Sequence, residues 1–419
     1  MSQTPSPQRV LLPLGLAVCL SLFGDLTLYV VLVTQREVVG LSLAAVGVML
    51  GVNRLIRIPA NPLAGSLLDR WGRRQLFVLG MLLGVLSTAS YALVHSFWPF
   101  LASRLAWGLA WTLINVGGMA MVLDISTRSN RGELTGFYNT WLQAGFVLGP
   151  LTGGLLVSRF GFRPAMLACA GLAAIGLIVV VAALPETAAW ANRAREVPPR
   201  PRLGLGRRLA QAWHEASRLL RADPRMATIL ALFAIVLFSG EGVILSTASL
   251  LLQQRLGQAL ALNGMLLEVT AASGILLGLR AVLAGLSGPL AGHLSDARLG
   301  RWAVTAGSLL LGILGFGLLF FAHSLELAML GILVGAISGG AAVAVLAAYM
   351  GDLTPPGRQG LAMGAYATAG DAGSMVGPFL AFALAAWADL RWVYLLCTIT
   401  FVIGLGLLWR IRAEVPPAR

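Results

Sequence analysis

The chain has 419 residues, of which 58% are hydrophobic and 11% are charged, and its mean hydropathy is +0.82. Because soluble proteins carry roughly 25% charged residues, this composition excludes a water-soluble globule and predicts that lipid surrounds most of the chain. All 30 basic residues are arginine and the net charge is +13, which in so apolar a chain indicates membrane orientation rather than a nucleic-acid partner.

Twelve apolar runs predict membrane spans, since each is about long enough to cross the hydrocarbon core of a bilayer. The runs are apolar on all sides, whereas the strands of a membrane barrel would alternate apolar and polar residues, so the spans are predicted to be helices. The predicted spans are 11–33, 42–66, 75–95, 98–123, 134–158, 164–184, 226–250, 264–294, 302–322, 325–350, 359–386 and 392–409.

The stretch 185–225 between the sixth and seventh spans is rich in proline and arginine and is predicted to be a linker. Its segment from Arg207 to Arg221 has an amphipathic pattern, which predicts contact with membrane lipid at the surface. Most arginines outside the spans lie in the two termini, in this linker and in the loops on the same side. Positive charge marks the cytoplasmic side, so both termini and the linker are predicted to be cytoplasmic. The use of arginine alone favours a GC-rich bacterial genome and therefore the bacterial inner (plasma) membrane.

The sequence contains two copies of one membrane unit. Pro62-Leu63-Ala64-Gly65 recurs as Pro289-Leu290-Ala291-Gly292. With one more residue between the copies, a further set matches: Asp124, Gly132, Gly136, Tyr138, Thr140, Gly145, Gly149, Pro150 and Arg163 correspond to Asp352, Gly360, Gly364, Tyr366, Thr368, Gly373, Gly377, Pro378 and Arg391. This predicts an all-α membrane protein with twelve transmembrane helices in two pseudo-symmetric six-helix halves, 1–184 and 226–419. Rocking two such halves opens their central seam to either side of a membrane, which indicates transport.

The second span ends in the motif Gly65-Ser66-Leu67-Leu68-Asp69-Arg70-Trp71-Gly72-Arg73-Arg74. Glycines permit close approach and positive φ, and an acid beside arginines can pair with them or accept from a helix N-terminus. The second copy, Gly292 to Arg301, is degenerate and retains Asp296.

This motif resembles the loop 2–3 motif of the major facilitator superfamily, and the span count, central loop and repeat extend the resemblance over nearly the whole chain. The chain is similar to the twelve-span drug/proton antiporter (efflux) group in particular. The resemblance implies the major facilitator fold and a conformational latch in which Asp69 and Arg73 hold the cytoplasmic side closed. The predicted latch residues are Gly65, Asp69, Arg70, Gly72, Arg73 and Asp296.

The fifth span carries Gly145-x-x-x-Gly149-Pro150-x-x-Gly153-Gly154, and Gly377-Pro378 lie in the corresponding part of the eleventh span. Small residues four apart let helices pack closely, and proline bends a helix. Generic helix packing is one reading. The full pattern also resembles the span 5 motif of superfamily antiporters that export compounds, which favours efflux over uptake.

Arg104-Leu105-Ala106-Trp107-Gly108 resembles the family's span 4 motif, although Trp107 stands where the family often has glutamine. A charge inside a span is costly and usually has an inward-facing partner, and burial raises the pKa of a carboxyl toward neutrality. Asp25 and Arg104 are therefore the predicted proton-coupling pair, as in several family exporters, with Glu241 and Asp371 as further candidates. A purely structural role for each of these charges stays open.

A second group of residues is predicted to line a substrate cavity. Asn53 and Arg57 belong to one polar stripe of the second span, Arg280 offers positive charge at similar depth in the second half, and Trp111 and Asn115 share a helix face with Arg104. Aromatic residues near these faces could form an amphiphilic wall, although aromatics in spans more often pack or face lipid. The aromatic candidates are Tyr29, Trp111, Tyr138, Trp141 and Tyr366.

Signals for an enzyme, a cofactor or a metal are missing from the sequence. The four histidines are scattered, and the three cysteines lie apart in apolar runs. A Walker-type loop cannot occur without lysine, so an ion gradient is the expected energy source. We expect a monomeric secondary transporter that exchanges protons for small amphiphilic solutes, outward. The alternatives are transport of an organic anion or sugar-like metabolite on the buried arginines and, in another class, a lipid flippase or membrane sensor.

Overall fold

A computed structural model describes residues 7–127, 130–187, 214, 221, 223–257, 259–262, 265–355 and 359–412. Most of the predicted linker 185–225, including most of the amphipathic segment, lies outside the described residues. Contacts divide the chain into two compact units: unit 1 comprises Met1–Leu203 with Leu256–Gly278, and unit 2 comprises Gly204–Arg255 with Leu279–Arg419. The boundaries predicted for the two halves stay a prediction.

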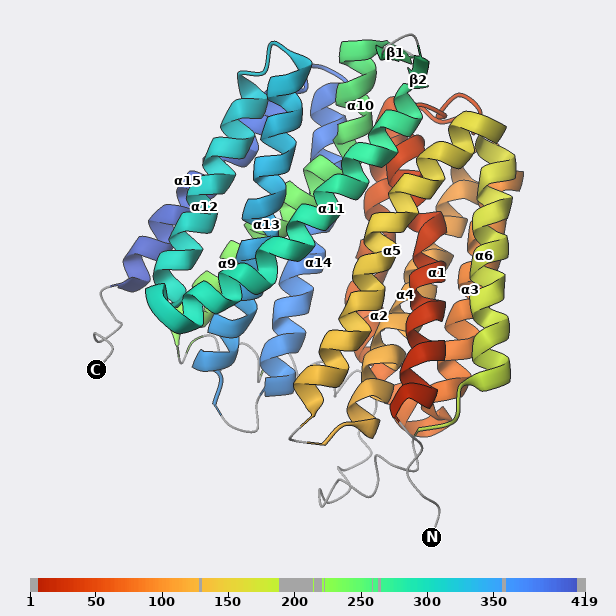
Figure 1. Cartoon of the computed structure of the whole chain (residues 1–419), viewed down its shortest axis with the longest axis vertical. Helices are drawn as coiled ribbons and strands as arrows, with labels where there is room; N and C mark the ends of the chain where they lie inside the picture. Colours follow the sequence, from red (N-terminus) through yellow and green to blue (C-terminus); the bar gives the residue numbers. More distant parts are fainter. Residues whose placement is uncertain are drawn as a thin grey trace. The chain divides into compact units, whose positions relative to one another are not determined.

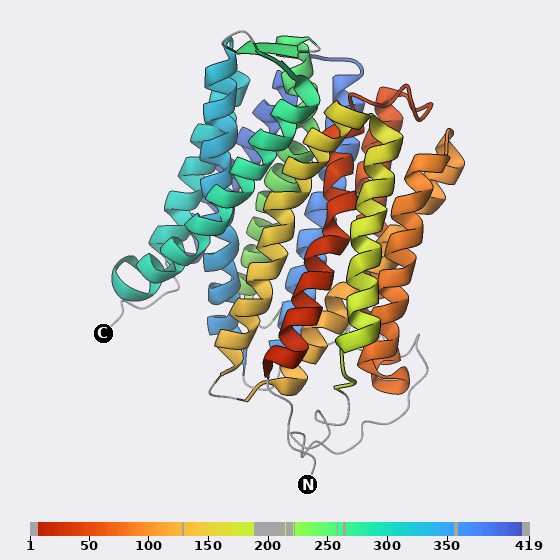
Figure 2. The same cartoon turned by 45° about the vertical axis from the view of Figure 1, so that its right-hand side comes forward.

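In the part of unit 1 that the structure describes, six long helices form a bundle (Figure 1). They are α1 (Pro7–Val31), α2 (Leu43–Trp71), α3 (Arg73–Leu93), α4 (Phe97–Ile125), α5 (Arg131–Phe160) and α6 (Phe162–Ala183). The helix α1 packs against α5 and α6, α3 packs against α4 and α6, and α2 packs against α4. Figure 2 shows α1 lying between α5 and α6. The first helix is therefore central to this bundle, and its last two turns are buried throughout.

Unit 2 is built mainly from α9 (Pro224–Leu237), α12 (Gly300–Phe320), α13 (Leu325–Leu353), α14 (Gln359–Ala385) and α15 (Arg391–Arg412). The helix α12 packs against α13 and α15, and α9 packs against α13, α14 and α15. The remaining elements are η1 (Phe238–Ile244), α10 (Leu245–Leu256), α11 (Val269–Leu294) and η2 (Ser295–Leu299). The helix α11 is divided between the units: its residues up to Gly278 belong to unit 1, and those from Leu279 onward belong to unit 2.

The helical membrane architecture predicted from the sequence is confirmed. Among the described residues, eleven helices are long and apolar enough to cross a membrane. The helix α14 covers residues Gln359–Ala385 of the predicted span 359–386 but is not among these eleven, and its sequence includes several glycines, a serine and Asp371. A helix with such a composition is expected where polar side chains or close helix contacts are needed, since lipid favours neither.

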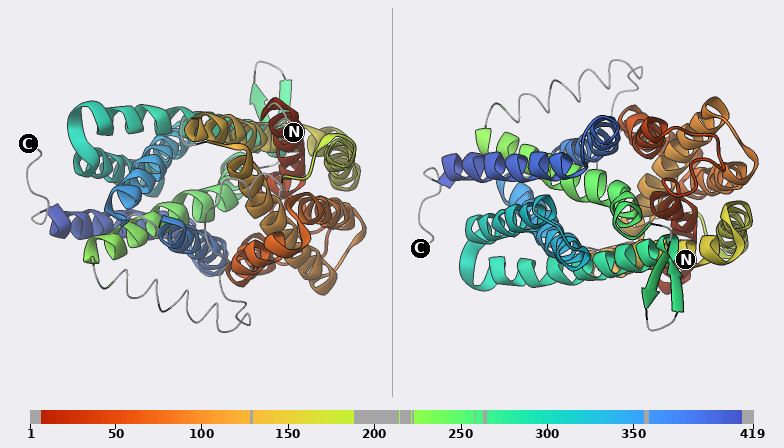
Figure 3. Two further views of the ribbon diagram at one scale, coloured as in Figure 1. Left: turned by 90° about the horizontal axis from the view of Figure 1, so that it is seen from below. Right: turned by 90° about the horizontal axis from the view of Figure 1, so that it is seen from above.

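Two spans differ from their predicted form. The seventh, predicted as one helix over 226–250, is interrupted by the π-helix η1, whose wider turn lies between α9 and α10. Gly240 and Gly242 flank Glu241 in this turn and leave room for the backbone to widen. The eighth, predicted from residue 264, begins as a helix at Val269. The two short antiparallel strands β1 (Ala259–Leu262) and β2 (Met265–Glu268) precede it and are drawn as neighbouring arrows in Figure 3.

Two glycines at matching positions of the repeat separate consecutive helices. Gly72 lies between α2 and α3 with φ of +92°, and Gly300 begins α12 with φ of +78°. A side chain at either position would be strained, because L residues rarely adopt positive φ. The tight turn that positions the loop motif of each repeat therefore requires glycine at this point.

Candidate functional site

A buried ion pair joins α1 to α4 in unit 1. Arg104 Nη1 donates to Asp25 Oδ1 over 2.5 Å, and Arg104 Nε donates to the carbonyl oxygen of Met49 over 2.6 Å. The Tyr91 hydroxyl oxygen lies 3.5 Å from Arg104 Nη1. The arginine side chain is fully buried, and that of Asp25 is 12% exposed. Because an uncompensated buried charge would cost several kcal/mol, each of these two side chains requires the other to remain charged.

Aromatic rings surround the same guanidinium. The Arg104 Cζ atom lies 5.9 Å from the centroid of the Tyr29 ring and 6.0 Å from that of Tyr91. Arg54 Cζ lies 5.8 Å from the Tyr29 ring, and the Tyr29 hydroxyl donates to the carbonyl oxygen of Leu50 over 2.9 Å. The faces of aromatic rings attract cations. Two arginines therefore lie against one tyrosine that is itself anchored to α2.

Unit 2 contains its own ion pair inside a span. Arg280 Nη2 of α11 donates to Glu241 Oε1 of η1 over 2.8 Å. The arginine side chain is 8% exposed, whereas that of Glu241 is 26% exposed. Asp371, the other acid predicted for this unit, is buried in α14. Asp25 and Glu241 thus each contact a buried arginine of their own unit.

The predicted cavity residues of α2 and α4 lie in different surroundings. Asn53 is buried, and its Oδ1 has no hydrogen-bond partner among the described residues. Gly108 of α4 approaches the backbone of Asn53, so this part of the α4 face packs against α2. Trp111 is buried and stacks on Trp107 with ring centroids 6.3 Å apart. Two other predicted residues, Arg57 and Asn115, are half-buried.

The remaining predicted aromatic residues pack within their own units. Tyr138 is fully buried in the apolar core of unit 1, next to Gly118. Trp141 packs against Gly15 of α1 and beside a small apolar cluster. Tyr366 stacks on Phe233 with ring centroids 3.7 Å apart, and its hydroxyl donates to the carbonyl oxygen of Val343 over 3.2 Å. Their role as a substrate wall stays a prediction.

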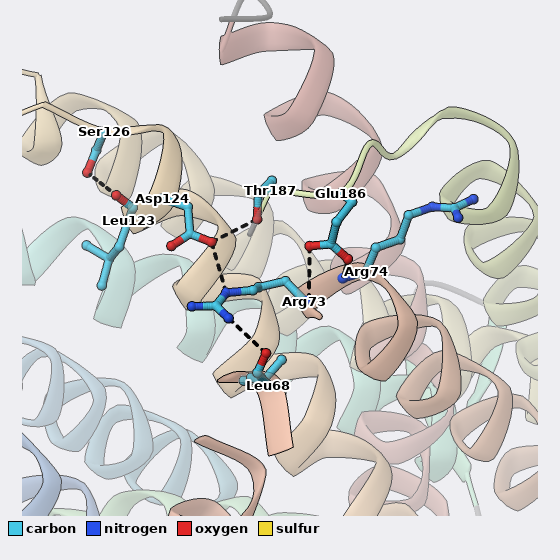
Figure 4. Close-up of polar contacts among 8 residues, drawn as sticks. All are labelled: Leu68, Arg73, Arg74, Leu123, Asp124, Ser126, Glu186 and Thr187. Atoms are coloured by element: carbon cyan, nitrogen blue, oxygen red, sulfur yellow. Dashed lines mark hydrogen bonds and ion pairs between the residues drawn. The ribbon is translucent and has the colours of Figure 1, made fainter. Parts of the chain in front are cut away.

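The loop motif of unit 1 centres on Arg73 (Figure 4). Its Nε donates to Asp124 Oδ2 at the end of α4 over 3.1 Å, and its Nη1 donates to the carbonyl oxygen of Leu68 over 2.8 Å. Glu186 accepts from the backbone nitrogens of Arg73 and Arg74, both over 3.1 Å, and Thr187 Oγ1 donates to Asp124 Oδ2 over 2.9 Å. The ends of α2, α4 and α6 are thereby connected at one end of the bundle. Three predicted latch residues, Gly65, Asp69 and Arg70, belong to α2, and their surroundings lie outside what the structure describes.

The second copy of the motif makes a corresponding set of contacts in unit 2. Arg301 Nε donates to Asp352 Oδ2 over 2.9 Å, and its Nη1 donates to Ser295 Oγ over 2.6 Å. Arg301 also forms an ion pair with Asp296, the acid predicted from the repeat. The acid and the arginine of this copy therefore do contact each other directly.

The predicted packing glycines of α5 face α1. A Cβ added at Gly145 would lie 2.8 Å from Leu22 Cδ1, and one at Gly149 would lie 3.0 Å from Leu26 Cβ. Gly153 lies against Thr27, whose hydroxyl donates to the carbonyl oxygen of Gly149 over 3.5 Å. In unit 2, Gly377 lies against the backbone of Gly242. Two prolines, Pro150 and Pro378, lie inside α5 and α14.

Several partners were not singled out from the sequence. Asp124 was noted only as a repeat match with Asp352, a signal that could have marked it as a partner of Arg73. Glu186 directly follows a proline after the sixth span, which is a weak signal. The sequence gives no signal for Tyr91 as a partner of Arg104. The same holds for the carbonyl of Met49, because any backbone carbonyl can accept a hydrogen bond.

The duplicated motifs, the buried ion pairs and the helices of spanning length define a multi-pass membrane protein of the transporter type. The profile of the Major Facilitator Superfamily matches residues 14–279 and 270–419. The chain belongs to the major facilitator superfamily, and it is a transporter of small molecules rather than an enzyme.

Relatives of known name include multidrug resistance proteins. Multidrug resistance protein 2 of Bacillus subtilis (strain 168) is 28% identical over 36% of this chain, and the match spans only 38% of that relative. Multidrug resistance protein MdtG of Dickeya zeae (strain Ech586) is 26% identical over 87% of this chain and 83% of that protein. Major facilitator superfamily domain-containing protein 10 of Mus musculus is 26% identical over 85% of this chain and 76% of that protein.

Solved structures share the fold. A bacterial homologue of the human lysosomal transporter Spinster, in an inward-facing and occupied conformation, superposes with a TM-score of 0.76 at 17% identity over 100% of both chains. The human organic anion transporter MFSD10 superposes with a TM-score of 0.65 at 21% identity, over 96% of this chain and 100% of that one. The predicted major facilitator fold is confirmed by these comparisons.

Proposed function

We propose that the protein is a proton-coupled exporter of small amphiphilic compounds that works as a monomer by alternating access. It would lie in the plasma membrane of a bacterium with both termini in the cytoplasm. The observation that carries the proposal is the buried pair of Asp25 and Arg104. A carboxylate that can hold either an arginine or a proton links proton binding to the contact between two helices.

The surroundings of Arg104 support a reversible break of this pair. When Asp25 takes a proton, Arg104 still donates to the carbonyl of Met49 and lies beside Tyr91, so the buried cation stays solvated by the protein. The helix α1 then loses its charged contact with α4. Asp25 lies in the same turn of α1 as Leu22 and Leu26, which pack on the glycines of α5. Protonation of Asp25 would therefore alter the packing of α1 against α5.

The contacts of Arg73 support a latch at the arginine-rich end of unit 1. Its hydrogen bonds join the ends of α2 and α4, and Glu186 adds the end of α6. An alternating-access cycle needs contacts that form in one state and break in another. We assign the Arg73–Asp124 contact to closure on the cytoplasmic side.

Export of amphiphiles is supported by the glycine–proline pattern of α5 and by relatives named as multidrug resistance proteins. Tyr29 and Trp111 of unit 1 offer ring faces, and the indole of Trp111 adds a donor, which suits compounds with an apolar body and a polar group. These side chains are the proposed contacts for such compounds.

The test is solute-dependent proton movement in proteoliposomes with an imposed pH gradient and an internal pH dye. Naphthamide, naphthoate and trimethyl(naphthylmethyl)ammonium would be supplied, with protein-free vesicles as background. We expect Asp25→Asn to abolish the proton movement while the protein still inserts in the membrane. Glu37→Gln is the matched control, because the Glu37 side chain is 88% exposed on the same unit. Wild-type proton movement in Asp25→Asn would refute the coupling role.

A second candidate function is transport of organic anions, or of a sugar-like metabolite, on the buried arginines. The buried Arg54, Arg104 and Arg280 favour it, and a similar solved structure is named an organic anion transporter. A strict requirement for the anionic probe would support this candidate over a general amphiphile exporter. Movement of labelled phospholipid without movement of any solute would instead support a flippase.

A further inference from the structure

The two ion pairs inside the spans differ in how many acceptors surround the arginine. Arg104 donates from Nε and Nη1 to three acceptors and is fully buried, while its Nη2 has no hydrogen-bond partner among the described residues. Arg280 makes one hydrogen bond among the described residues, from Nη2 to Glu241 Oε1. Its Nε is buried and has no hydrogen-bond partner in the described part of the chain. A buried guanidinium nitrogen without an acceptor is costly, so this site has an unused capacity for an anion.

The unused nitrogen lies on the same edge of the guanidinium as the one that Glu241 occupies. In arginine, the N–H groups of Nε and Nη2 point in parallel and form a fork that matches the two oxygens of one carboxylate. Glu241 fills only half of this fork, over 2.8 Å. A carboxylate that approached freely would engage both nitrogens and would therefore bind better than the tethered glutamate does.

Glu241 is also the accessible member of the pair. Its side chain is 26% exposed, compared with 8% for Arg280. An acid that faced hydrocarbon would be costly, which favours water or a polar space on its exposed side. Gly240 lies beside the pair: a Cβ there would be 3.5 Å from Arg280 Nη2, so the glycine leaves this nitrogen unshielded by a side chain.

We propose that Arg280 binds the carboxylate of an anionic amphiphile and that Glu241 is the internal counter-ion which this carboxylate replaces. The proposal rests on the transport function above and names the charge of its substrates. Exchange of one carboxylate for another keeps the buried arginine neutralised throughout, so no uncompensated charge arises inside the span. The π-helix η1 supports the exchange, because its wide turn carries Glu241 at a site where single side chains are commonly re-aimed for function.

Asp25 does not offer the same exchange. Arg104 is fully enclosed. Its Nη2 also lacks an acceptor, but the Nε on the same edge of the guanidinium already donates to the carbonyl of Met49. An incoming anion would have to break that contact as well. Of the two arginines, Arg280 is therefore the one assigned to the anion, whereas Asp25 and Arg104 keep the proton-coupling role.

The test is equilibrium binding of naphthoate to the full chain in nanodiscs at pH 7.5. We expect Glu241→Gln to tighten naphthoate binding about tenfold, because the competing charge is gone while the side chain keeps its size. The double variant Glu241→Gln/Arg280→Gln keeps the pair neutral and should fold, and we expect it to bind naphthoate at least about tenfold more weakly than the wild type. Neutral naphthamide should bind all three proteins equally.

The matched control is Asp223→Asn, which removes the acid from another ion pair of unit 2 with the same distance of 2.8 Å, between Arg225 Nη2 and Asp223 Oδ2. It should leave naphthoate affinity unchanged. Equal naphthoate affinity in all variants, weaker binding to Glu241→Gln, or no naphthoate binding at all would overturn the proposal.

The proposed proton coupling is tested separately. One outcome is that Asp25→Asn abolishes proton movement while the variants of Glu241 and Arg280 leave naphthoate affinity unchanged. It would support the coupling role and refute the anion site. If Glu241→Gln and the double variant behave as expected while Asp25→Asn transports normally, the anion site stands and the coupling role falls.

Discussion

Arg73 and Arg301 occupy equivalent positions in the two repeats and make the same contact in their own units. Each donates from Nε to the aspartate at the end of a long helix, to Asp124 over 3.1 Å and to Asp352 over 2.9 Å. The surroundings of the two contacts differ. Both side chains of the unit 1 pair are 10% exposed, whereas Arg301 is 24% and Asp352 is 56% exposed. The same geometry is therefore enclosed in one repeat and open to solvent in the other.

This difference predicts unequal costs for removing the two aspartates. We expect Asp124→Asn to destabilise the protein by about 3 to 5 kcal/mol, because it removes a buried carboxylate that accepts from the buried guanidinium of Arg73. Asp352→Asn should cost about 0 to 1 kcal/mol, because Arg301 is partly exposed to solvent and keeps its ion pair with Asp296. Thermal melting in a mild detergent at low salt measures both. Equal shifts in melting temperature would contradict the burial argument.

Arg104→Lys tests whether charge alone is sufficient at the ion pair of unit 1. Lysine keeps the charge, but one ammonium cannot reproduce the donation to Asp25 together with the donation to the carbonyl of Met49. We expect proton-driven transport in proteoliposomes to fall by about tenfold or more, since a lost charged hydrogen bond typically costs about 1.5 to 3 kcal/mol. Tyr91→Phe is the milder comparison, because its oxygen lies 3.5 Å from Arg104 Nη1. Full activity of the lysine variant would show that the fork geometry is dispensable.

The contact between α1 and α5 predicts that replacing two glycines of α5 by alanine changes the stability of the protein unequally. Gly145→Ala would place a methyl group 2.8 Å from Leu22 Cδ1 and 3.2 Å from the backbone carbonyl oxygen of Cys19, and we expect a loss of about 1 to 3 kcal/mol through overpacking. Gly136→Ala is the control, since no atom lies within 4 Å of its added Cβ, and it should be neutral or slightly stabilising. The measurement is thermal unfolding of both variants in the same detergent. A stable Gly145→Ala protein would mean that α1 and α5 can move apart at little cost.

Asp223 predicts a dependence of stability on pH at the start of α9. Its side chain accepts from the backbone nitrogen and Nε of Arg225, both over 3.0 Å. The Arg225 hydrogen bonds lower the pKa of Asp223 below its ordinary value of 3.8. Because the folded pKa is lower than the unfolded one, the stabilisation is present above the unfolded value and is lost as the pH falls through the folded value.

We therefore expect Asp223→Ala to destabilise the protein by about 1 kcal/mol at pH 7 through loss of the helix cap. The difference between wild type and Asp223→Asn, which keeps a capping oxygen without the charge, should shrink below about pH 4. Melting curves between pH 7 and the lowest pH that the detergent sample tolerates would measure it. A constant difference over this range would contradict the role of the charge.

The sequence predicted which charged residues inside the spans matter, but only part of their pairing. Asp25, Arg104, Glu241 and Arg280 stood out because charges are rare in apolar spans and costly there. Their pairing did not follow in full: Arg280 was placed with substrate and Glu241 with protons, yet the two contact each other. Spacing along one helix shows which residues share a face, but the partner on another helix depends on rotation and depth, which packing decides.

The loop motif shows the same limit. The motif around Arg73 was recognised from residues in a row, but its partners Asp124 and Glu186 lie 51 and 113 residues further along the chain. The π-helix η1 was also missed, because the apolar run around it reads as an ordinary helix and Gly240 and Gly242 are compatible with both forms.

By itself, the sequence determined that the chain spans a membrane many times, that it is duplicated, and that it resembles a known transporter family. Composition, run length and repetition are properties of the chain read in order, so no contact is needed to recognise them. Only the tertiary structure decided that Arg280 neutralises Glu241, which copy of the loop motif is enclosed, and which nitrogens of the buried arginines have no acceptor. Those properties arise where helices distant in sequence meet, and close packing on glycine faces sets the distances there.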